Sequence, residues 1–383
     1  MYICASEYLS TTEMRPRGIA DLPLHRGGVP EWLAKRMVKL ARAIVRVLVE
    51  EYGRREFVER ISDPFWFQAL GNVLGFDWHS SGLTTVVTAV LKTAIDPREM
   101  GIAVCGGKGA ASLRTPRELE RVGELLGLST SRVEELKRAS VLAAKVDNAA
   151  VQDGYSLYHH AVIVAEGGYW AIVQQGMRPE EKSARRYHWL GELVSSFVEE
   201  PHSSIVGDRR HEEVLDMTAR ESGGARRACV DLVRDGPWRL RPVLARLEGF
   251  ATLDEWLGDR SRVPRRVDKY LRMPWRINWR ALKRAYEIQP RNYEELLGIR
   301  GIGPSTVRGL ALVAELIYGE EPSWRDPVKF SFAFGGKDGV PFPVDRKAMD
   351  EAIQFLEESI KMAELGYRER VEALKRLRAY APR

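Results

Sequence analysis

The spacing of hydrophobic residues constrains the fold of this chain more than any other feature of its sequence. Through most of its length, apolar positions recur at the three- to four-residue interval of an amphipathic helix. Helical segments are predicted at residues 30–60, 64–95, 116–145, 208–320 and 346–380. The chain is therefore expected to be mostly helical.

One segment breaks the helical period. Residues 155–177 (YSLYHHAVIVAEGGYWAIVQQGM) are rich in Tyr, Val, Ile and Trp, and Glu166-Gly167-Gly168 divides them into two halves. Two such runs joined by a glycine turn predict a β-hairpin. Residues 328–334 (VKFSFAF) are a shorter strand candidate. We therefore expect a fold that is mostly α with a small antiparallel β-sheet, in the α+β class.

A length of 383 residues is sufficient for two or three domains, each with its own core. Residues 1–13 lack periodicity, which indicates a flexible leader or a start codon placed too early. A polar, glycine-containing stretch at 205–235 favours a domain boundary. The predicted division is an N-terminal α+β domain at 14–220 and a C-terminal helical domain at 221–383.

Composition argues against a membrane or disulfide-rich protein. No apolar run reaches the roughly 20 residues of a spanning helix, and no signal peptide is evident, so a cytoplasmic location is expected. Cys4, Cys105 and Cys229 are too scattered for a disulfide framework or a thiolate zinc site. Asn and Gln are scarce beside abundant Arg and Glu, which is typical of thermophilic proteins.

The positive charge of the chain is concentrated in one stretch. Residues 260–291 hold eleven Lys or Arg against two acids, an excess larger than the net +6 of the whole chain. Within this stretch the basic residues are interleaved with tryptophans, as in RMPWRINWRALKR. A concentrated basic stretch of this kind predicts a face that contacts a polyanion, through its phosphates rather than its bases.

A pair of glycines separates two apolar helical runs at 296–312 (LLGIRGIGPSTVRGLAL). Asn292 suits the N-cap of the first helix, Pro304 suits the first position of the second, and Gly319 suits its C-cap. Gly301 and Gly303 permit positive φ and carry no Cβ. The turn and the start of the second helix are therefore expected to present backbone N–H groups to a phosphate oxygen.

This stretch, residues 292–319 in the C-terminal half of the chain, resembles the helix-hairpin-helix DNA-binding motif. The motif reads hydrophobic-x-Gly-hydrophobic-Gly before its second helix, and Ile299, Gly301, Ile302 and Gly303 fill those places. The resemblance implies duplex or structured DNA as a partner, held with little sequence dependence. The expected DNA-binding residues are Gly301, Ile302, Gly303, Ser305, Thr306, Arg300 and Arg308, together with Arg272, Arg276, Arg280 and Lys283 of the basic stretch.

Many helix-hairpin-helix proteins are DNA glycosylases, and the C-terminal part of the chain resembles that superfamily. Its essential aspartate follows a Gly/Pro-rich segment, a place that Asp345 takes in GGKDGVPFPVDRKAMDEAI. Ser305 stands where lyase members carry their lysine, so the resemblance implies a monofunctional glycosylase. Asp345 lies 42 residues beyond Gly303, farther than the superfamily usually allows, and it also suits a helix N-cap.

A rival set of candidate catalytic residues lies at 145–160 (KVDNAAVQDGYSLYHH) and comprises Lys145, Asp147, Asp153, His159 and His160. Carboxylates and imidazole suit Mg, Mn or Zn, so Asp147, Asp153 and His159 are candidate ligands of a divalent metal for phosphodiester hydrolysis. Because neighbouring residues of a strand face opposite ways, His159 and His160 are not expected to share one site. A nuclease acid-x-Lys pattern is absent, since the second strand reads Val173-Gln174-Gln175.

A glycine-rich segment at 105–112 (CGGKGAAS) invites comparison with a phosphate-binding loop. It lacks the Gly-x-x-x-x-Gly-Lys-Ser/Thr spacing of that loop. We therefore predict a turn here, with Lys108 available to a phosphate.

Four blocks of sequence resemble an uncharacterised prokaryotic family known as domain of unknown function 763, nearly throughout the chain from Met14. They read RGIADLPLHRGGVPEWLAKRM, VQDGYSLYHHAVIV, RRYHWL and FSFAFGGKDGVPFPVDRK. This resemblance implies no mechanism.

From the helix-hairpin-helix resemblance and the basic stretch, we expect a DNA-binding protein of genome maintenance that hydrolytically processes DNA, either as a metal-dependent nuclease or as a glycosylase. A non-catalytic DNA-binding or scaffold protein is the further alternative.

Overall fold

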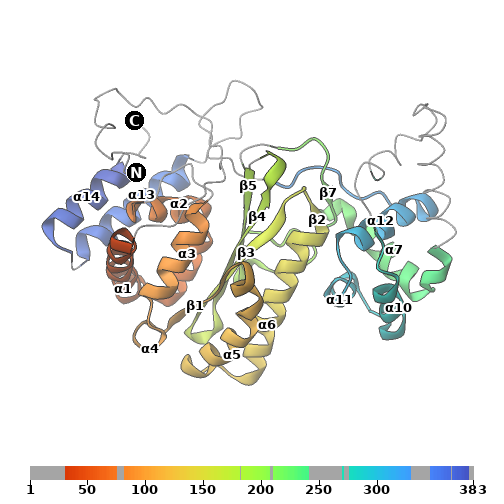
Figure 1. Cartoon of the computed structure of the whole chain (residues 1–383), viewed down its shortest axis with the longest axis horizontal. Helices are drawn as coiled ribbons and strands as arrows, with labels where there is room; N and C mark the ends of the chain where they lie inside the picture. Colours follow the sequence, from red (N-terminus) through yellow and green to blue (C-terminus); the bar gives the residue numbers. More distant parts are fainter. Residues whose placement is uncertain are drawn as a thin grey trace, which may run out of the picture.

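A five-stranded antiparallel sheet lies at the centre of the molecule, in the order β1-β3-β4-β5-β6 (Figure 1). The computed structural model describes residues 31–75, 82–181, 183–207, 210–240, 270, 276–328, 346–363 and 365–378. The strands of the sheet are β1 (Ile102–Lys108), β3 (Ser156–Ala165), β4 (Trp170–Arg178), β5 (Ser183–Leu190) and β6 (Ser204–Val206). A separate two-stranded sheet pairs β2 (Val151–Gln152) with β7 (Leu215–Asp216).

The expected β-hairpin is confirmed as strands β3 and β4, which pair with Val162 opposite Ile172. Gly167 and Gly168, with φ of 79° and 82°, form the turn between them. Alternate residues of β3 enter different hydrophobic cores: Ile163 packs in one and Val162 in the other. Because both faces of the sheet are covered, the strand reads as a nearly continuous apolar run.

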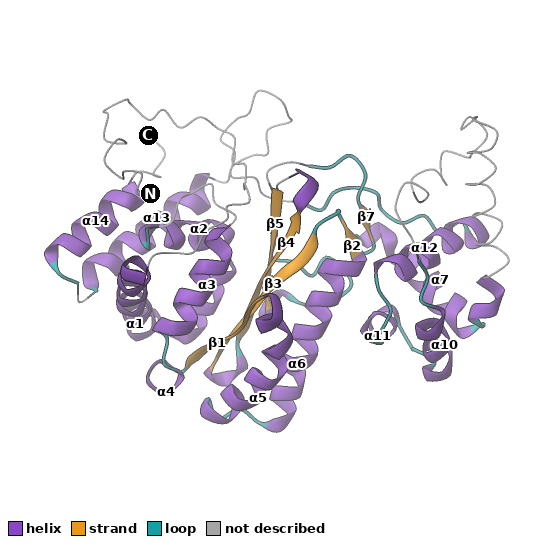
Figure 2. Cartoon of the chain, in the orientation of Figure 1, coloured by secondary structure: helices purple, strands orange, loops and turns teal. Residues whose placement is uncertain are grey.

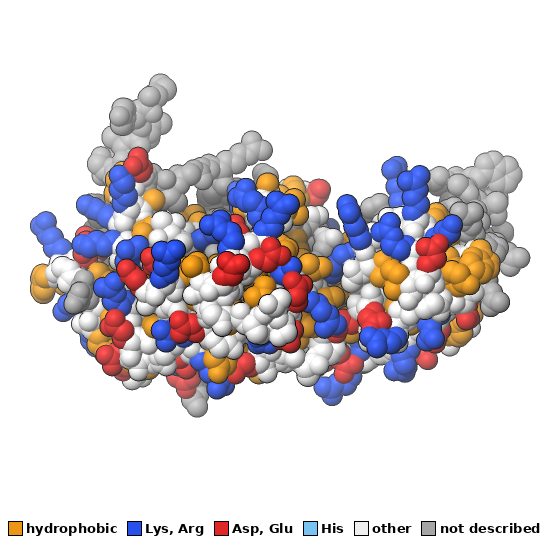
Figure 3. Space-filling view, turned by 90° about the horizontal axis from the view of Figure 1, so that it is seen from below, with side chains coloured by type: hydrophobic (Ala, Val, Ile, Leu, Met, Phe, Trp, Pro, Cys, Tyr) orange, Lys and Arg blue, Asp and Glu red, His pale blue; other side chains and the backbone are white. Residues whose placement is uncertain are grey.

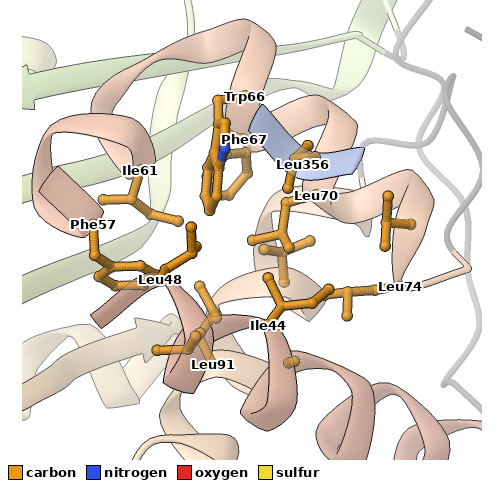
Figure 4. Close-up of a cluster of buried hydrophobic side chains, with 14 of the residues drawn as sticks. Ile44, Leu48, Phe57, Ile61, Trp66, Phe67, Leu70, Leu74, Leu91 and Leu356 are labelled. Atoms are coloured by element: carbon orange, nitrogen blue, oxygen red, sulfur yellow. The ribbon is translucent and has the colours of Figure 1, made fainter. Parts of the chain in front are cut away.

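One face of the sheet packs against helices from both ends of the chain (Figure 2). Trp66, Phe67, Phe57 and Leu356 lie in this core, shown in Figure 4. The helices are α1 (Glu31–Ser62), α2 (Pro64–Val73), α3 (Gly82–Ala94), α13 (Arg346–Met362) and α14 (Tyr367–Arg378), with the short α4 (Pro97–Met100) leading into β1.

The opposite face packs against α5 (Thr115–Leu125) and α6 (Thr130–Lys145), and this core continues into a helical lobe. A π-helical turn, Val146–Ala150, follows α6 directly. The lobe, on the right of Figure 1, contains α7 (Gly223–Arg234), α10 (Trp279–Ile288), α11 (Tyr293–Gly298) and α12 (Pro304–Tyr318). Among the residues that the structure describes, no helix is long and apolar enough to cross a membrane.

The fold class is the expected one, and several elements differ from the sequence prediction. Residues 102–108 form β1 and the turn begins only at Gly109, whereas a turn was predicted over 105–112. Strand β5 was not predicted, and β7 interrupts a region predicted to be helical. Of the strand candidate at 328–334, only Val328 lies within the described residues. The domain division stays a prediction, although α13 and α14 pack against α1 and α2.

Candidate nucleic-acid interface

Helices α11 and α12 are joined by a five-residue turn, residues 299–303, which we call the α11–α12 turn. Asn292 caps α11, and its side chain accepts a hydrogen bond from the Glu295 N–H at 2.9 Å. Pro304 occupies the first position of α12, and Gly319, with φ of 70°, ends it in the left-handed conformation. The three capping predictions made from the sequence are thereby confirmed.

The two glycines of the α11–α12 turn differ in conformation. Gly301 has φ of 97°, and a Cβ there would lie 2.9 Å from Cβ of Ala281. Gly303 has φ of −130°, and a Cβ there would meet no atom within 4 Å. Gly301 therefore uses the positive φ that glycine permits, whereas Gly303 does not. Gly303 instead leaves open space beside the first turn of α12.

The carbonyl groups of the turn accept hydrogen bonds from side chains of α6 and of α10 with its N-cap. The Lys145 ammonium, at the end of α6, donates to O of Ile302 at 2.7 Å and to O of Ile299 at 3.3 Å. Asn278 Nδ2 donates to O of Gly301 at 3.3 Å, and Arg284 Nη1 donates to O of Arg300 at 3.4 Å. Partial burial lowers the pKa of Lys145. This lysine, a catalytic candidate from the sequence, fixes the orientation of the turn.

Some N–H groups in and just after the turn are unpaired, whereas the Ile302 N–H donates to O of Ile299 at 3.1 Å. No acceptor for the amides of Gly301, Gly303 or Ser305 is present among the residues whose structure is described, and no side chain caps the start of α12. The first amides of any α-helix lack intrahelical partners and carry partial positive charge. With its carbonyls hydrogen-bonded to side chains and these amides unpaired, the turn is suited to bind an anion.

Exposed basic side chains lie on the same lobe as the turn. Arg276, Arg280, Lys283 and Arg300 are all exposed; Arg276 precedes α10, whereas Arg280 and Lys283 lie within it. Lys and Arg side chains are prominent on the face of this lobe seen from below (Figure 3). Arg272 lies outside the described residues. The structure thus brings four of the predicted basic residues onto the lobe that carries the turn.

Three other predicted DNA-binding residues of this region point inward. The Thr306 hydroxyl accepts from the Asn278 N–H at 3.2 Å, and Ile302 is buried in the core. Arg308 Nε donates to Gln152 Oε1 at 2.9 Å, and burial lowers the pKa of this guanidinium to about 10. Gln152 in turn donates to O of Pro304 at 2.9 Å. Arg308 thereby joins α12 to β2, and Thr306 joins it to the start of α10, so these side chains support the fold rather than a surface ligand.

The candidate acids at 147 and 153 lie in the protein interior. Asp147 accepts from Trp189 Nε1 at 3.0 Å and also contacts His202 and Gln174. Asp153 is fully buried and accepts from Arg185 Nη1 at 2.9 Å and from the Tyr187 hydroxyl at 2.6 Å. Desolvation raises the pKa of Asp153, while the charge of Arg185 opposes that shift.

His159 and His160 face opposite sides of the sheet, as expected for neighbours in a strand. His159 Nε2 lies 3.0 Å from the Thr88 hydroxyl of α3. His160 Nε2 lies 2.8 Å from the Ser140 hydroxyl of α6, and its Nδ1 lies 2.7 Å from Gln174 Oε1. Thus Asp147 and His159 are on different faces, and the structure does not assemble the proposed metal ligands.

Within the described ranges, no three His, Cys, Asp or Glu side chains are close enough to hold a metal ion. The groups that contact Asp147 and Asp153 are nitrogen and hydroxyl groups of the protein. Asp345 lies outside the described residues.

The buried histidines predict sensitivity of the fold to acid. Burial lowers the pKa of His159 to about 3 and that of His160 to about 4. Below pH 6.5 the unfolded chain binds protons that the folded chain does not. The free energy of unfolding therefore decreases as the pH is lowered, until the pH reaches the pKa values of the folded state. At about 1.4 kcal/mol per pH unit for each histidine, the pair should reduce the free energy of unfolding by about 4 kcal/mol at pH 5.

Urea unfolding at pH 7 and pH 5 measures this effect. Acids with raised pKa values contribute in the opposite sense, so His159→Gln and His160→Gln are compared with the unaltered chain. Each substitution should make the loss of stability on acidification smaller. An unchanged pH dependence in both variants would show that these histidines are not held neutral by the fold.

Sequence reasoning missed the buried ion cluster that holds Asp153. Arg185 bridges Asp153 and Asp326, with Nη1 at 2.9 Å from both carboxylates and Nη2 at 2.8 Å from Asp326. The only signal is the basic pair in SARRYHWL, in a segment that would otherwise suit a strand. Its acidic partner Asp326 is distant in sequence, so the pattern alone does not predict the cluster.

Comparison with known proteins gives one match. A family model described as "Protein of unknown function (DUF763)" matches residues 18–344. Searches of the curated proteins and of the solved structures gave no significant match. The matched range includes the central sheet, the buried ion cluster and the α11–α12 turn.

Proposed function

We propose that this chain, which belongs to the family of proteins of unknown function (DUF763), is a DNA-binding protein of genome maintenance. In this proposal the α11–α12 turn holds the phosphate backbone, in the manner implied by the helix-hairpin-helix resemblance. The exposed basic residues of α10 extend the contact. The description of the family supplies no activity, so the proposal rests on this chain's own residues.

The polarity of the α11–α12 turn carries the proposal. Four consecutive carbonyls, those of residues 299–302, accept hydrogen bonds from Lys145, Asn278 and Arg284. The amides of Gly301, Gly303 and Ser305 have no acceptor among the residues that the structure describes. A turn fixed in this way offers several N–H donors to one anion without reorganisation, and phosphate is the anion that such helix starts commonly bind.

The surrounding charge favours a polymer of phosphates over a single small anion. Arg276, Arg280, Lys283 and Arg300 are exposed on the lobe that carries the turn, and long basic side chains of this kind suit successive phosphates. Backbone amides and flexible basic side chains read no base edges. Binding is therefore proposed to depend strongly on salt and weakly on sequence.

A double charge reversal tests this interface. Arg280→Glu/Lys283→Glu should weaken binding to a blunt duplex by about tenfold or more at moderate salt, and should reduce the dependence of log affinity on log salt by about one per lost phosphate contact. Fluorescence anisotropy of a labelled duplex over a salt series measures both quantities.

The matched control is Arg98→Glu/Arg368→Glu, two exposed arginines on α4 and α14 in the helical layer across the sheet. This control should bind the duplex like the unaltered chain. If the α10 reversal also binds like the unaltered chain, the proposed interface is wrong.

Catalysis is a separate question with a separate assay. The buried acids Asp147 and Asp153 serve the fold in this proposal, and no step is assigned to them. Labelled undamaged and damaged DNA, incubated with and without divalent metal and then treated with alkali, distinguishes three outcomes. Metal-dependent cleavage indicates a nuclease, alkali-labile sites without metal indicate a glycosylase that Asp345→Asn should inactivate, and binding without product indicates a non-catalytic protein.

A further inference from the structure

We infer that Trp238 and Tyr286 form a stacking platform for an unpaired DNA base beside the α11–α12 turn. The inference rests on the proposed function and narrows its substrate to DNA that contains a single-stranded segment next to a duplex. Three observations support it: the exposure of Trp238, the packing of its indole against Tyr286 and Gly236, and the position of the pair along α10.

Trp238 is exposed and yet held in place. It belongs to a short 3-10 turn after α7, Pro237–Arg239, and 56 % of its surface is exposed. Its ring centroid lies 4.8 Å from that of Tyr286, at an interplanar angle of 73°. Gly236, with φ of 115°, packs directly against the indole of Trp238, since a Cβ there would lie 2.4 Å from indole Cζ2. A large aromatic surface is thus presented to solvent in a defined orientation.

Helix α10 connects this aromatic pair to the α11–α12 turn. Its N-cap Asn278 contacts O of Gly301, and Arg284 contacts O of Arg300. Tyr286 lies eight residues beyond Asn278, which is about 12 Å along a helix. At the far end, Gln289 Nε2 donates to O of Tyr286 at 2.6 Å and to O of Arg234 at 3.5 Å, which joins α10 to α7. The pair and the turn are therefore connected through hydrogen bonds of α10.

Charge along α10 favours a nucleic acid over a protein as the occupant. Arg280, Lys283 and Arg284 are exposed between the turn and Tyr286, and Glu287, the one acid of the helix, lies 4.0 Å from Lys283. Trp279, Lys283 and Tyr286 recur at helical spacing and share one side of the helix, while Arg280 and Arg284 lie on another side. A single strand that runs along α10 from the turn would place phosphates near these cations and a base on the indole.

The test compares a blunt duplex with the same duplex carrying a short single-stranded tail. The unaltered chain should bind the tailed DNA about tenfold more tightly than the blunt DNA, since stacking of one base commonly contributes an effect of this size or larger. Trp238→Ala should abolish this preference and leave the affinity for the blunt duplex within about twofold, as expected when stacking alone is lost. Trp238→Phe should keep most of the preference.

The control is Trp32→Ala on α1, another tryptophan with 61 % of its surface exposed, which should leave both affinities unchanged. Thermal melting shows whether each variant is folded. Equal affinity of the unaltered chain for both DNAs, or an equal loss on both in Trp238→Ala, overturns the platform. Absence of salt-sensitive binding to the blunt duplex overturns the proposed function instead, so the two failures are distinguishable. Loss of preference in Trp32→Ala as well would place the base elsewhere.

Discussion

Arg185→Met is expected to lower the free energy of unfolding by about 3–5 kcal/mol, the usual cost of removing one partner from a buried ion cluster. The guanidinium is fully buried between the carboxylates of Asp153 and Asp326. Burial alone lowers the pKa of Arg185, but the two carboxylates outweigh that effect and raise it. Without the arginine, two desolvated carboxylates would lie close together with no cation, so one of them must be protonated or the fold must open.

Urea unfolding at neutral pH measures this loss. Arg178→Met is the matched control, because Arg178 forms a partly exposed ion pair with Glu181 at the end of the same sheet and should change stability by less than about 1 kcal/mol. Adding Asp326→Asn to Arg185→Met should recover part of the loss, since one buried charge is removed. A single Arg185→Met variant as stable as the control would contradict the structural role of the cluster.

The cluster also connects the central sheet to the segment that follows α12. Asp326 follows α12, and besides Arg185 it accepts from the His211 N–H at 2.7 Å and from the Val328 N–H at 3.0 Å. Arg185 lies on β5 of the central sheet. The segment after the α11–α12 lobe is thereby fixed to the sheet, so the expected destabilisation is global rather than local.

Local patterns account for what the sequence predicted of the fold. The β3–β4 hairpin and the long helices were visible because period and turn chemistry are local properties. Strand β1 was missed because its CGGK end is rich in glycine, and its strand conformation depends on pairing with β3, where Gly106 lies opposite Ala161. A Cβ at Gly106 would come within 2.3 Å of O of His160, so close approach between strands requires the glycine.

Strand β5 shows the limit of sequence reasoning more sharply. Its residues Arg185, Arg186 and His188 are all buried, although charged residues normally indicate an exposed segment. They are tolerated because partners from other elements contact them: Asp153 and Asp326 contact Arg185, and Gln68 accepts from Arg186 Nη2 at 3.1 Å. Tertiary contacts of this kind leave no periodic signal in the sequence.

The candidate interface divides along the same line. Asn292, Pro304 and Gly319 were assigned from local rules, and the structure confirms each of them. Local rules did not predict the role of Lys145, because its contacts with Ile299 and Ile302 join residues more than 150 positions apart in the chain. Its sequence neighbours, which include two aspartates, suggested catalysis, whereas its location suggests support of the turn.

Gly301→Ala is expected to weaken duplex binding by about a hundredfold, because a distorted turn would lose about two amide–phosphate hydrogen bonds at 1.5 kcal/mol or more each. The substitution places a Cβ at φ of 97°, within 2.9 Å of Ala281. It should also lower stability by about 1–2 kcal/mol from the backbone conformation alone. Anisotropy with a blunt duplex measures the affinity, and urea unfolding measures the stability.

Two matched glycines of the same lobe separate the loss of binding from the loss of stability. Gly319→Ala, at φ of 70° with open space around it, should cost similar stability at the far end of α12 and leave DNA affinity unchanged. Gly303→Ala is conformationally permitted, so stability should be preserved, but its methyl group would occupy the space beside the unpaired amides and weaken binding. If Gly301→Ala and Gly303→Ala both retained full affinity, phosphate would not bind at this turn. If Gly319→Ala lost affinity as strongly as Gly301→Ala, general destabilisation would explain both losses.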